Sequence, residues 1–506
     1  MKWKKTVGLT LSICLAAGAL AGCNGSETAG NDTGDTVELT WMLLGPGEQK
    51  DSEMVWDDFN QKLNEVLPGT KVNFRVYPTA EYAEKYKLVS AANEPIDLTW
   101  VGWVIDTVGE TRRNSYLELD ELIAEYAPDI LKEVPAALID SIRVDGKIYQ
   151  IPNYQMMTNN RWAVATHKDL SDQYWDTEEV KEVLYANETM TEECYDIIEE
   201  YLEKLKQNNQ IKLGVSTETF ARLAQKGFQQ IGGYNFVVRR NDPNYEVLNV
   251  YTTPEMKLFY DKMHDWYEKG YIRKDILTVQ NPIQDEGNLN GYVLWSPAYF
   301  DNTEESLSMQ NGFPITVIPQ NEEYYFDGGS ATGTAISSKS EHPERAMQVL
   351  DLMNTQKGKD LYNELVFGIE GTHYNKVSDT RAEMLSYQSE PDSNSPYGQY
   401  KWVIGNTFNA YEIQSDPVGW NEYVKGINEA AIPSPLIGFM FDNTNVKIEQ
   451  AQVDAIVQEF SRALNSGAIA DYDSYYAEMM EKLNVAGIEK LRAEVQRQVD
   501  EFAASK

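Results

Sequence analysis

The chain has 506 residues, with 79 acidic against 44 basic side chains and a formal net charge of −35. A charge of this size repels nucleic acid and other polyanions, so it argues against a nucleic-acid-binding role and favours a neutral ligand. Two of the three cysteines lie within the first 23 residues, so the rest of the chain has only Cys194 and cannot form an internal disulfide. Hydrophobic burial alone must therefore hold the folded part together.

The first 23 residues have the three-part pattern of a secretory signal, with lysines, then an uncharged run, then small residues. That run is shorter than the roughly 20 apolar residues of a membrane span. Its end, Leu20-Ala21-Gly22-Cys23, resembles the lipobox of bacterial lipoproteins, which implies a diacylglyceryl group on the sulfur of Cys23. An ordinary signal peptide with a coincidental cysteine is the alternative. Residues 24–36 are rich in small polar residues and predict a flexible tether.

Strand and helix patterns alternate at the start of the mature chain. The apolar positions follow strand, helix, strand, helix, strand in residues 37–44, 52–66, 71–78, 79–93 and 96–103. This βαβαβ order predicts a parallel sheet covered by helices.

After residue 161 the predicted secondary structure is first mainly helical and then again a mixture of strands and helices. Residues 161 to about 292 are richer in helix signals, and strands are then predicted at 291–299 and 315–320, before a helix that begins at Pro343. Two amphipathic helices are predicted near the end, at about 444–464 and 487–504. The last has one continuous apolar stripe, which we expect to cover a lobe of the protein rather than to bind a partner helix.

Several segments carry a resemblance to a known family. DGKIYQIPNYQ, RWAVATHKDL and SSKSEHPERAMQVLDLMN resemble the extracellular solute-binding proteins of ABC importers, in the carbohydrate group related to maltose-binding protein. FGIEGTHYNKV, KWVIGN and the segment from SPLIGFMFDNTNVKIEQA to the end resemble the C-terminal region of the LipO- and LplA-type lipoproteins of Gram-positive bacteria. The resemblance implies an α/β fold of two lobes joined by a hinge, with the ligand in the cleft, closure on binding and no enzyme activity.

The resemblance also implies where the lobes begin and end. It places residues 37–152 and 297–354 in an N-terminal lobe, and residues 153–296 and 355–506 in a C-terminal lobe that includes the helical tail. The chain would then cross between the lobes near Pro152, near 295–297 and near Asn354. The expected protein is a monomer, held by Cys23 on the extracellular face of the cell membrane, that delivers its ligand to the transmembrane subunits of an ABC permease.

A sugar-binding site needs aromatic rings for the flat sugar face and fixed polar partners for the hydroxyl groups. Aromatic residues at strand ends and crossings, polar residues of the loop after the first strand and two residues of KWVIGN are the candidates, namely Gly45, Glu48, Trp100, Trp103, Tyr154, Trp295, Tyr299, Trp402 and Asn406. Trp402 and Asn406 are predicted to come from the second lobe. We expect an oligosaccharide to stack on Trp103 and Trp295, although each aromatic taken singly could equally be a core residue.

Catalytic and metal-binding patterns are weak in this sequence. The four histidines are scattered without the spacing of a zinc site, and residues 328–332 miss the serine nucleophile elbow because Thr332 replaces its last glycine. Asp471 and Asp473 have a calcium-like spacing that is better explained by a helix cap. We therefore expect no cofactor, metal or catalytic residue. A tethered glycoside hydrolase and a binding protein for another solute, such as a peptide, remain the alternatives.

Overall fold

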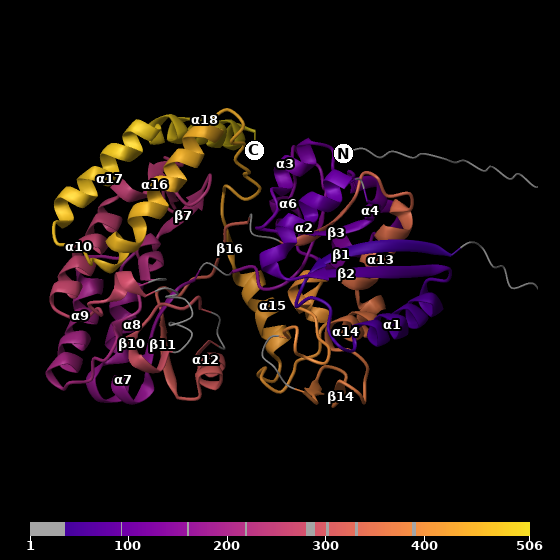
Figure 1. Cartoon of the computed structure of the whole chain (residues 1–506), viewed down its shortest axis with the longest axis horizontal. Coiled ribbons are helices and arrows are strands. Elements are labelled where there is room, and N and C mark those ends of the chain that lie inside the picture. The colour runs from indigo at the N-terminus through magenta and orange to yellow at the C-terminus, as the bar shows by residue number, and fades with distance from the viewer. Residues whose placement is uncertain are drawn as a thin grey trace, which may run out of the picture.

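The computed structural model describes residues 36–92, 94–158, 161–217, 220–279, 289–299, 303–328, 332–386 and 391–505. They form two lobes that lie side by side (Figure 1). The predicted signal peptide with Cys23, and all of the predicted tether except its last residue, lie outside these ranges. Among the described residues, no helix combines the length and the apolar character that a membrane span requires.

The first lobe is built on a five-stranded sheet with the order β2-β1-β3-β13-β4. Its strands are β1 (Val37–Leu44), β2 (Thr70–Tyr77), β3 (Leu98–Val101), β4 (Ile151–Pro152) and β13 (Gly333–Ile336). Its helices are α1 (Ser52–Val66), α2 (Thr79–Ala92), α3 (Thr107–Arg112), α4 (Asp120–Tyr126), α5 (Ile130–Glu133), α6 (Ala136–Ser141), α13 (Pro343–Asn354), α14 (Lys359–Phe367) and α15 (Trp420–Ala430), and β14 (Tyr374–Lys376) pairs with β15 (Ala382–Met384) at the periphery.

The predicted βαβαβ start is confirmed. Strand β1 pairs in parallel with both β2 and β3, as expected when each crossover is a helix. In α1, Val55, Phe59 and Leu63 are fully buried, whereas Val66, the last residue of the helix, is 57% exposed. Helix α13 begins at Pro343 as predicted, because proline lacks only an N–H group that the first turn leaves unpaired.

In its described residues, the second lobe is mainly helical around three small sheets. Its helices are α7 (Lys168–Tyr174), α8 (Thr177–Ala186), α9 (Glu192–Gln207), α10 (Pro254–Glu268), α12 (Thr303–Asn311), α16 (Lys447–Ser466), α17 (Tyr472–Ala486) and α18 (Ile488–Ala504). Its strands are β5 (Ala163–His167), β6 (Gly214–Val215), β7 (Phe228–Ile231), β8 (Phe236–Arg239), β9 (Leu248–Asn249), β10 (Tyr292–Leu294) and β11 (Ile315–Pro319). The two-lobed α/β fold with a C-terminal helical extension is confirmed.

The C-terminal helices α16 to α18 pack on the second lobe, as the apolar stripe of the last one predicts. The buried side chains of α18 join the same core cluster as those of α9 and α10. Helix α16 ends at Gly467, where the backbone has φ +64° and an added Cβ would lie 2.2 Å from the carbonyl oxygen of Met263, so only glycine fits. Helix α17 was not predicted as an element, but its N-cap was, because the Asp471 side chain accepts a hydrogen bond from Ser474 N.

The described parts of the chain show three crossings between the lobes, and two of them differ from the predicted positions. Strand β11 pairs along its whole length with β5, so residues 315–319 belong to the second lobe, and the chain returns only at β12 (Tyr325–Phe326). The buried side chains of 361–424 join the core of the first lobe, and the third crossing is at β16 (Ile432–Pro433), which pairs with β12. The predicted placement of 297–354 in the first lobe and of 355–506 in the second is therefore corrected.

An ion cluster around the buried carboxyl of Glu364 joins α1 to α14 within the first lobe. Lys62 Nζ lies 2.5 Å from a carboxyl oxygen of Glu364 and 2.8 Å from one of Asp58. Burial, and then the neighbouring Asp58 carboxylate, raise the pKa of Glu364 from 4.5 to about 7. The carboxyl of Glu364 and then the ammonium of Lys62 lower the pKa of Asp58. Glu364 is therefore partly protonated near neutral pH.

The Glu364→Gln variant tests the raised pKa of Glu364 through the pH dependence of stability. A raised folded-state pKa stabilises the protein below the unfolded value of about 4.5, and this stabilisation is lost as the pH rises through about 7. An amide does not titrate, so the unfolding free energy of the variant relative to wild type should rise between about pH 5 and pH 8, by up to about 3 kcal/mol. Denaturant unfolding of both proteins at the two pH values measures this difference in unfolding free energy. The exposed Glu489→Gln serves as control, and a difference that is flat with pH would contradict the expectation.

Candidate ligand-binding cleft

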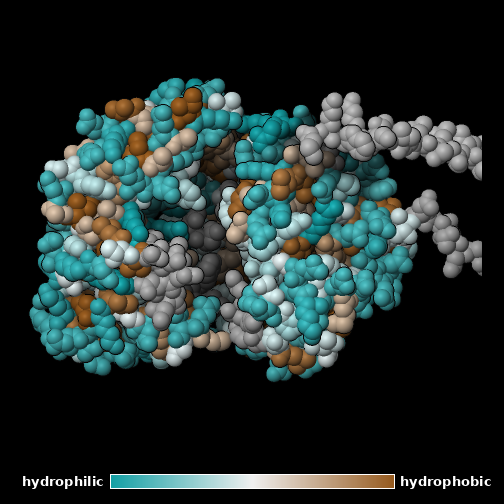
Figure 2. All heavy atoms as spheres, viewed as in Figure 1, coloured by the Kyte–Doolittle hydropathy of each residue, from teal (hydrophilic) through white to brown (hydrophobic). Residues whose placement is uncertain are grey.

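A cavity of about 1710 Å³ lies between the two lobes and is lined by residues of both. Figure 2 shows the hollow between the two halves of the surface. A volume of this size exceeds the roughly 300–1,000 Å³ of a typical small-molecule pocket, so it can hold a chain of several rings.

The first-lobe wall of the cavity is aromatic. Trp103 is 63% exposed, and its ring lies 5.4 Å from that of Trp402, centroid to centroid, at an interplanar angle of 34°. Trp100 is fully buried behind both rings, in edge contact with Trp103 at 5.3 Å. Gly102 permits this arrangement, because a Cβ there would lie 2.6 Å from the Trp100 ring. The wall therefore offers apolar ring faces on a fixed support.

The position of Trp402 follows from hydrogen bonds within the first lobe. Asn153 Nδ2 donates to the carbonyl oxygen of Trp402 at 2.9 Å, and Thr332 Oγ1 donates to the same oxygen at 3.2 Å. Tyr400 stacks on the Trp402 ring at 5.5 Å and 9°. Trp402 thus belongs to the first lobe, and its predicted assignment to the second lobe is corrected.

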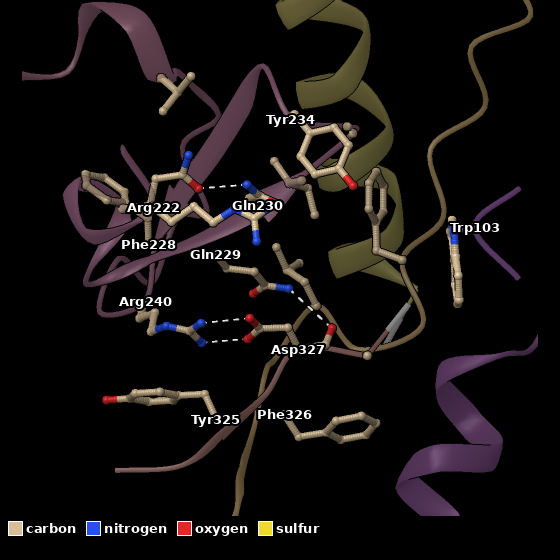
Figure 3. Close-up of a pocket in the computed structure, with 18 of the residues that line it drawn as sticks. Trp103, Arg222, Phe228, Gln229, Gln230, Tyr234, Arg240, Tyr325, Phe326 and Asp327 are labelled. Atoms are coloured by element: carbon tan, nitrogen blue, oxygen red, sulfur yellow. Dashed lines mark hydrogen bonds and ion pairs between the residues drawn. The ribbon is translucent and has the colours of Figure 1, made fainter. Parts of the chain in front are cut away.

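The second-lobe wall is polar and comes largely from the β7–β8 hairpin, against which the crossing segment of β12 and Asp327 lies (Figure 3). Gln229 and Gln230 lie on β7, and Tyr234 in the turn is 78% exposed. Arg240 forms two hydrogen bonds of 2.6 and 2.7 Å with the carboxylate of Asp327, and its guanidinium lies 4.1 Å from the Tyr325 ring centroid. This wall faces the tryptophans with groups that bind hydroxyl groups.

Three residues, Trp162, Arg222 and Gln320, form a further part of the second-lobe wall, which we call the floor subsite. The Arg222 guanidinium lies 4.4 Å from the Trp162 ring centroid. Gln320 N donates to the carbonyl oxygen of Trp162 at 2.9 Å, and the Gln320 side chain is 5% exposed. Its Oε1 atom is buried and accepts no hydrogen bond from the described residues. A buried acceptor of this kind is costly unless a ligand or water satisfies it.

Comparisons with known proteins agree with this architecture. The chain is 26% identical to the carbohydrate ABC transporter substrate-binding protein of Streptococcus pneumoniae, over 100% of this chain and 99% of that protein. It is 21% identical to the polygalacturonan/rhamnogalacturonan-binding protein YtcQ of Bacillus subtilis, over 75% of each. The crystal structure of the N-glycan transport solute-binding protein NgtS of S. pneumoniae matches with a TM-score of 0.74 at 23% identity, covering 92% of this chain and 99% of that one.

The resemblance to solute-binding proteins of ABC importers is confirmed. Residues 435–504 match the family model "Domain of unknown function (DUF3502)". In the structure this region begins just after the third crossing and contains α16 to α18. NgtS in complex with Man5GlcNAc also matches, with a TM-score of 0.63 at 23% identity over 93% of this chain and 99% of that one.

The cavity brings together only two of the predicted site residues, Trp103 and Trp402. Trp100 supports them from behind. Tyr154 is buried against Phe408 at 4.7 Å, and Asn406 is 2% exposed, with its side chain capping the turn at Phe408 N. Both belong to the first-lobe core rather than to the cavity wall.

The remaining predicted residues lie away from the cavity lining. Trp295 is 4% exposed within the β5–β10–β11 core, so it offers no face on which a sugar could stack in this structure. The Tyr299 ring is covered by the Arg161 guanidinium at 4.7 Å. Gly45 lies against Gln399, whose side chain would be 2.3 Å from an added Cβ, and Glu48 is exposed on the same loop.

Sequence reasoning missed the second-lobe wall. Its signal was the GGYN turn at 232–235 between two apolar strands, which presents an exposed tyrosine beside positive-φ glycines. Nothing local indicates that this hairpin faces the cleft, because that depends on its packing against α18, where Gly232 meets Val495.

Proposed function

We propose that the protein is a membrane-tethered solute-binding protein that captures an oligosaccharide between its lobes and delivers it unchanged to an ABC importer permease. The observation that supports this most directly is the pair of opposed walls, with Trp103 and Trp402 on one lobe and the amides and paired ions of the β7–β8 region on the other. Sugar rings present an apolar face and a hydroxyl rim, so the two walls match the two sides of one ligand. The names of the relatives support the same substrate class.

Closure follows from this arrangement. A ligand that touches both walls binds the closed form more tightly than the open form, and only this difference in affinity can shift the balance between the forms. The crossings at β12 and β16 are two residues long and paired to each other, which suits them to act as the hinge. A dissociation constant of about 1 µM, roughly −8 kcal/mol, would let the permease take up the ligand.

The membrane part of the proposal comes from the sequence. We propose that the lipid on Cys23 holds a monomer on the extracellular face of the membrane, and that the tether of residues 24–36 lets both lobes reach the permease. Two acyl chains on one cysteine give the stable anchoring that a single chain does not.

The alternative of a glycoside hydrolase finds less support in the cavity. A hydrolase needs two carboxyl groups free to face the scissile bond. Four acids line the described cavity. Asp327 is engaged in the two-bonded pair with Arg240, Asp106 accepts from Gly109 N at the start of α3, and Glu188 accepts from Asn241 Nδ2. Among the described residues, only Glu323 of these four has a carboxyl group without a hydrogen bond or ion pair, and one such group is short of the pair that hydrolysis needs, which favours binding without turnover.

Binding and turnover can be separated in one experiment. The soluble form without residues 1–23 is mixed with a panel of oligosaccharides, and tryptophan fluorescence, calorimetry and chromatography of the sugar are recorded. We expect fluorescence to change on binding, because Trp103 lies exposed in the cavity wall, and the sugar to be recovered intact. Release of shorter sugars would establish the hydrolase instead. Binding of peptides but of no sugar would establish another solute.

A further inference from the structure

Arg222 differs from the other arginines of the cavity wall. Arg239 holds the Glu255 carboxylate with bonds of 2.8 and 3.1 Å, and Arg240 holds Asp327 in the same two-bonded way. Arg222 forms no ion pair with any acid of the described residues. Arg345 and Arg462 also lack an acid partner, but both donate hydrogen bonds to backbone carbonyl oxygens, whereas Arg222 donates none to the described residues.

The neighbouring tryptophan orients this arginine. The guanidinium lies over the Trp162 ring at 4.4 Å, so one flat face is covered and the N–H groups at its edge stay available. Figure 3 shows Arg222 extending from the second-lobe wall toward the side on which Trp103 lies. Guanidinium N–H groups are arranged as a fork that matches the two oxygens of a carboxylate.

A second group at the same place lacks its partner. Gln320 is anchored through its backbone to Trp162, and its Oε1 atom is buried without a hydrogen-bond donor among the described residues. A carboxylate cannot satisfy this acceptor, but a hydroxyl group on the same sugar ring can. The floor subsite therefore offers a cationic fork for an acid and a fixed acceptor for a neighbouring hydroxyl group.

We propose that the floor subsite of Trp162, Arg222 and Gln320 binds a carboxylate-bearing sugar residue, so that the preferred ligand is an acidic oligosaccharide such as a uronate. This inference rests on the proposed function and narrows its substrate class. It departs from the neutral ligand that the net charge of −35 favours. Net charge acts at long range and is screened beyond roughly 8–10 Å at physiological salt, whereas a fork in direct contact with a carboxylate is not.

The test uses matched pairs of sugars. Short oligogalacturonates, oligomannuronates and sialylated oligosaccharides are each compared with the carboxyl-reduced form of the same chain, by calorimetry on the full mature protein. We expect one acidic series to bind about tenfold or more tightly than its reduced form, the gain of a charge-assisted pair. Arg222→Gln should abolish that difference while leaving the affinity for the reduced form within about twofold, and Arg222→Lys should restore part of it.

The controls separate this contact from a general charge effect. Arg497→Gln removes the same charge from an exposed site on α18, where the side chain pairs with Glu494, and should change nothing. Raising the salt concentration should leave most of the wild-type preference for the acidic form in place, because the contact is direct, and should create no such preference in Arg222→Gln. Equal binding of acidic and reduced sugars, or an equal loss for both in Arg222→Gln, would overturn the inference and leave the proposed function intact. If no sugar of either series binds, the proposed function itself is wrong.

Discussion

Replacing Trp103 and Trp402 together by alanine is expected to weaken oligosaccharide binding by about a hundredfold or more. Each ring is a large apolar surface in the first-lobe wall, and truncating a central aromatic anchor commonly costs about 2 kcal/mol or more. The ring centroids lie 5.4 Å apart, so the losses of binding free energy in the two single variants should not sum to the loss in the double variant. Calorimetry with the tightest sugar of the panel measures all three variants.

Trp295 provides the matched control for this experiment. It lies 4% exposed in the second-lobe core, so Trp295→Phe should leave affinity within about twofold while lowering the melting temperature. The expectation from the sequence, in which the sugar stacks on Trp103 and Trp295, predicts instead that Trp295→Phe lowers the affinity. Full affinity in the Trp103/Trp402 double variant, with a loss in Trp295→Phe, would show that the ligand sits elsewhere than on the first-lobe wall.

Local sequence patterns predicted many of the helices and strands. The alternation of apolar residues in 37–44 and the helical spacing in α1, α13 and α18 each reflect one buried face, which any short window of sequence reveals. The crossings are different. Strands β12 and β16 have two residues each, too few for a period, and they exist because two distant segments pair at the hinge. The second and third crossings were therefore misplaced, although the number of lobes was right.

In the candidate site, too, some residues could be predicted from local sequence, and others come together only in the fold. Trp103 was predictable because it follows the carboxyl end of a strand in an open α/β sheet, where ligands commonly bind. Trp295 was a poor choice because its neighbours Tyr292, Val293 and Leu294 are all buried, so β10 is a core strand on both faces. Arg222 and Gln320 come from segments about 100 residues apart, and only the fold places both beside Trp162. A single sequence contains no signal that predicts this long-range contact.

The C-terminal region gives the largest expected effect on stability. Val495 of α18 is fully buried and its methyl groups would lie 2.8 and 2.9 Å from a Cβ added at Gly232, so it packs directly on the β7–β8 turn. Val495→Asp places an unpaired carboxylate in that contact and should cost about 4 kcal/mol or more. The matched Val485→Asp alters a side chain that is 84% exposed and should cost less than about 0.5 kcal/mol.

This prediction also tests how the tail serves the cleft. If α18 holds the β7–β8 hairpin that carries Gln229 and Tyr234, Val495→Ala should lower the melting temperature and also weaken sugar binding, because the second-lobe wall loses its support. The melting curve and calorimetry below the transition report the two effects separately. Wild-type stability in Val495→Asp would mean that α18 is not docked on the second lobe. Unchanged affinity in a destabilised Val495→Ala would mean that the hairpin keeps its place without α18.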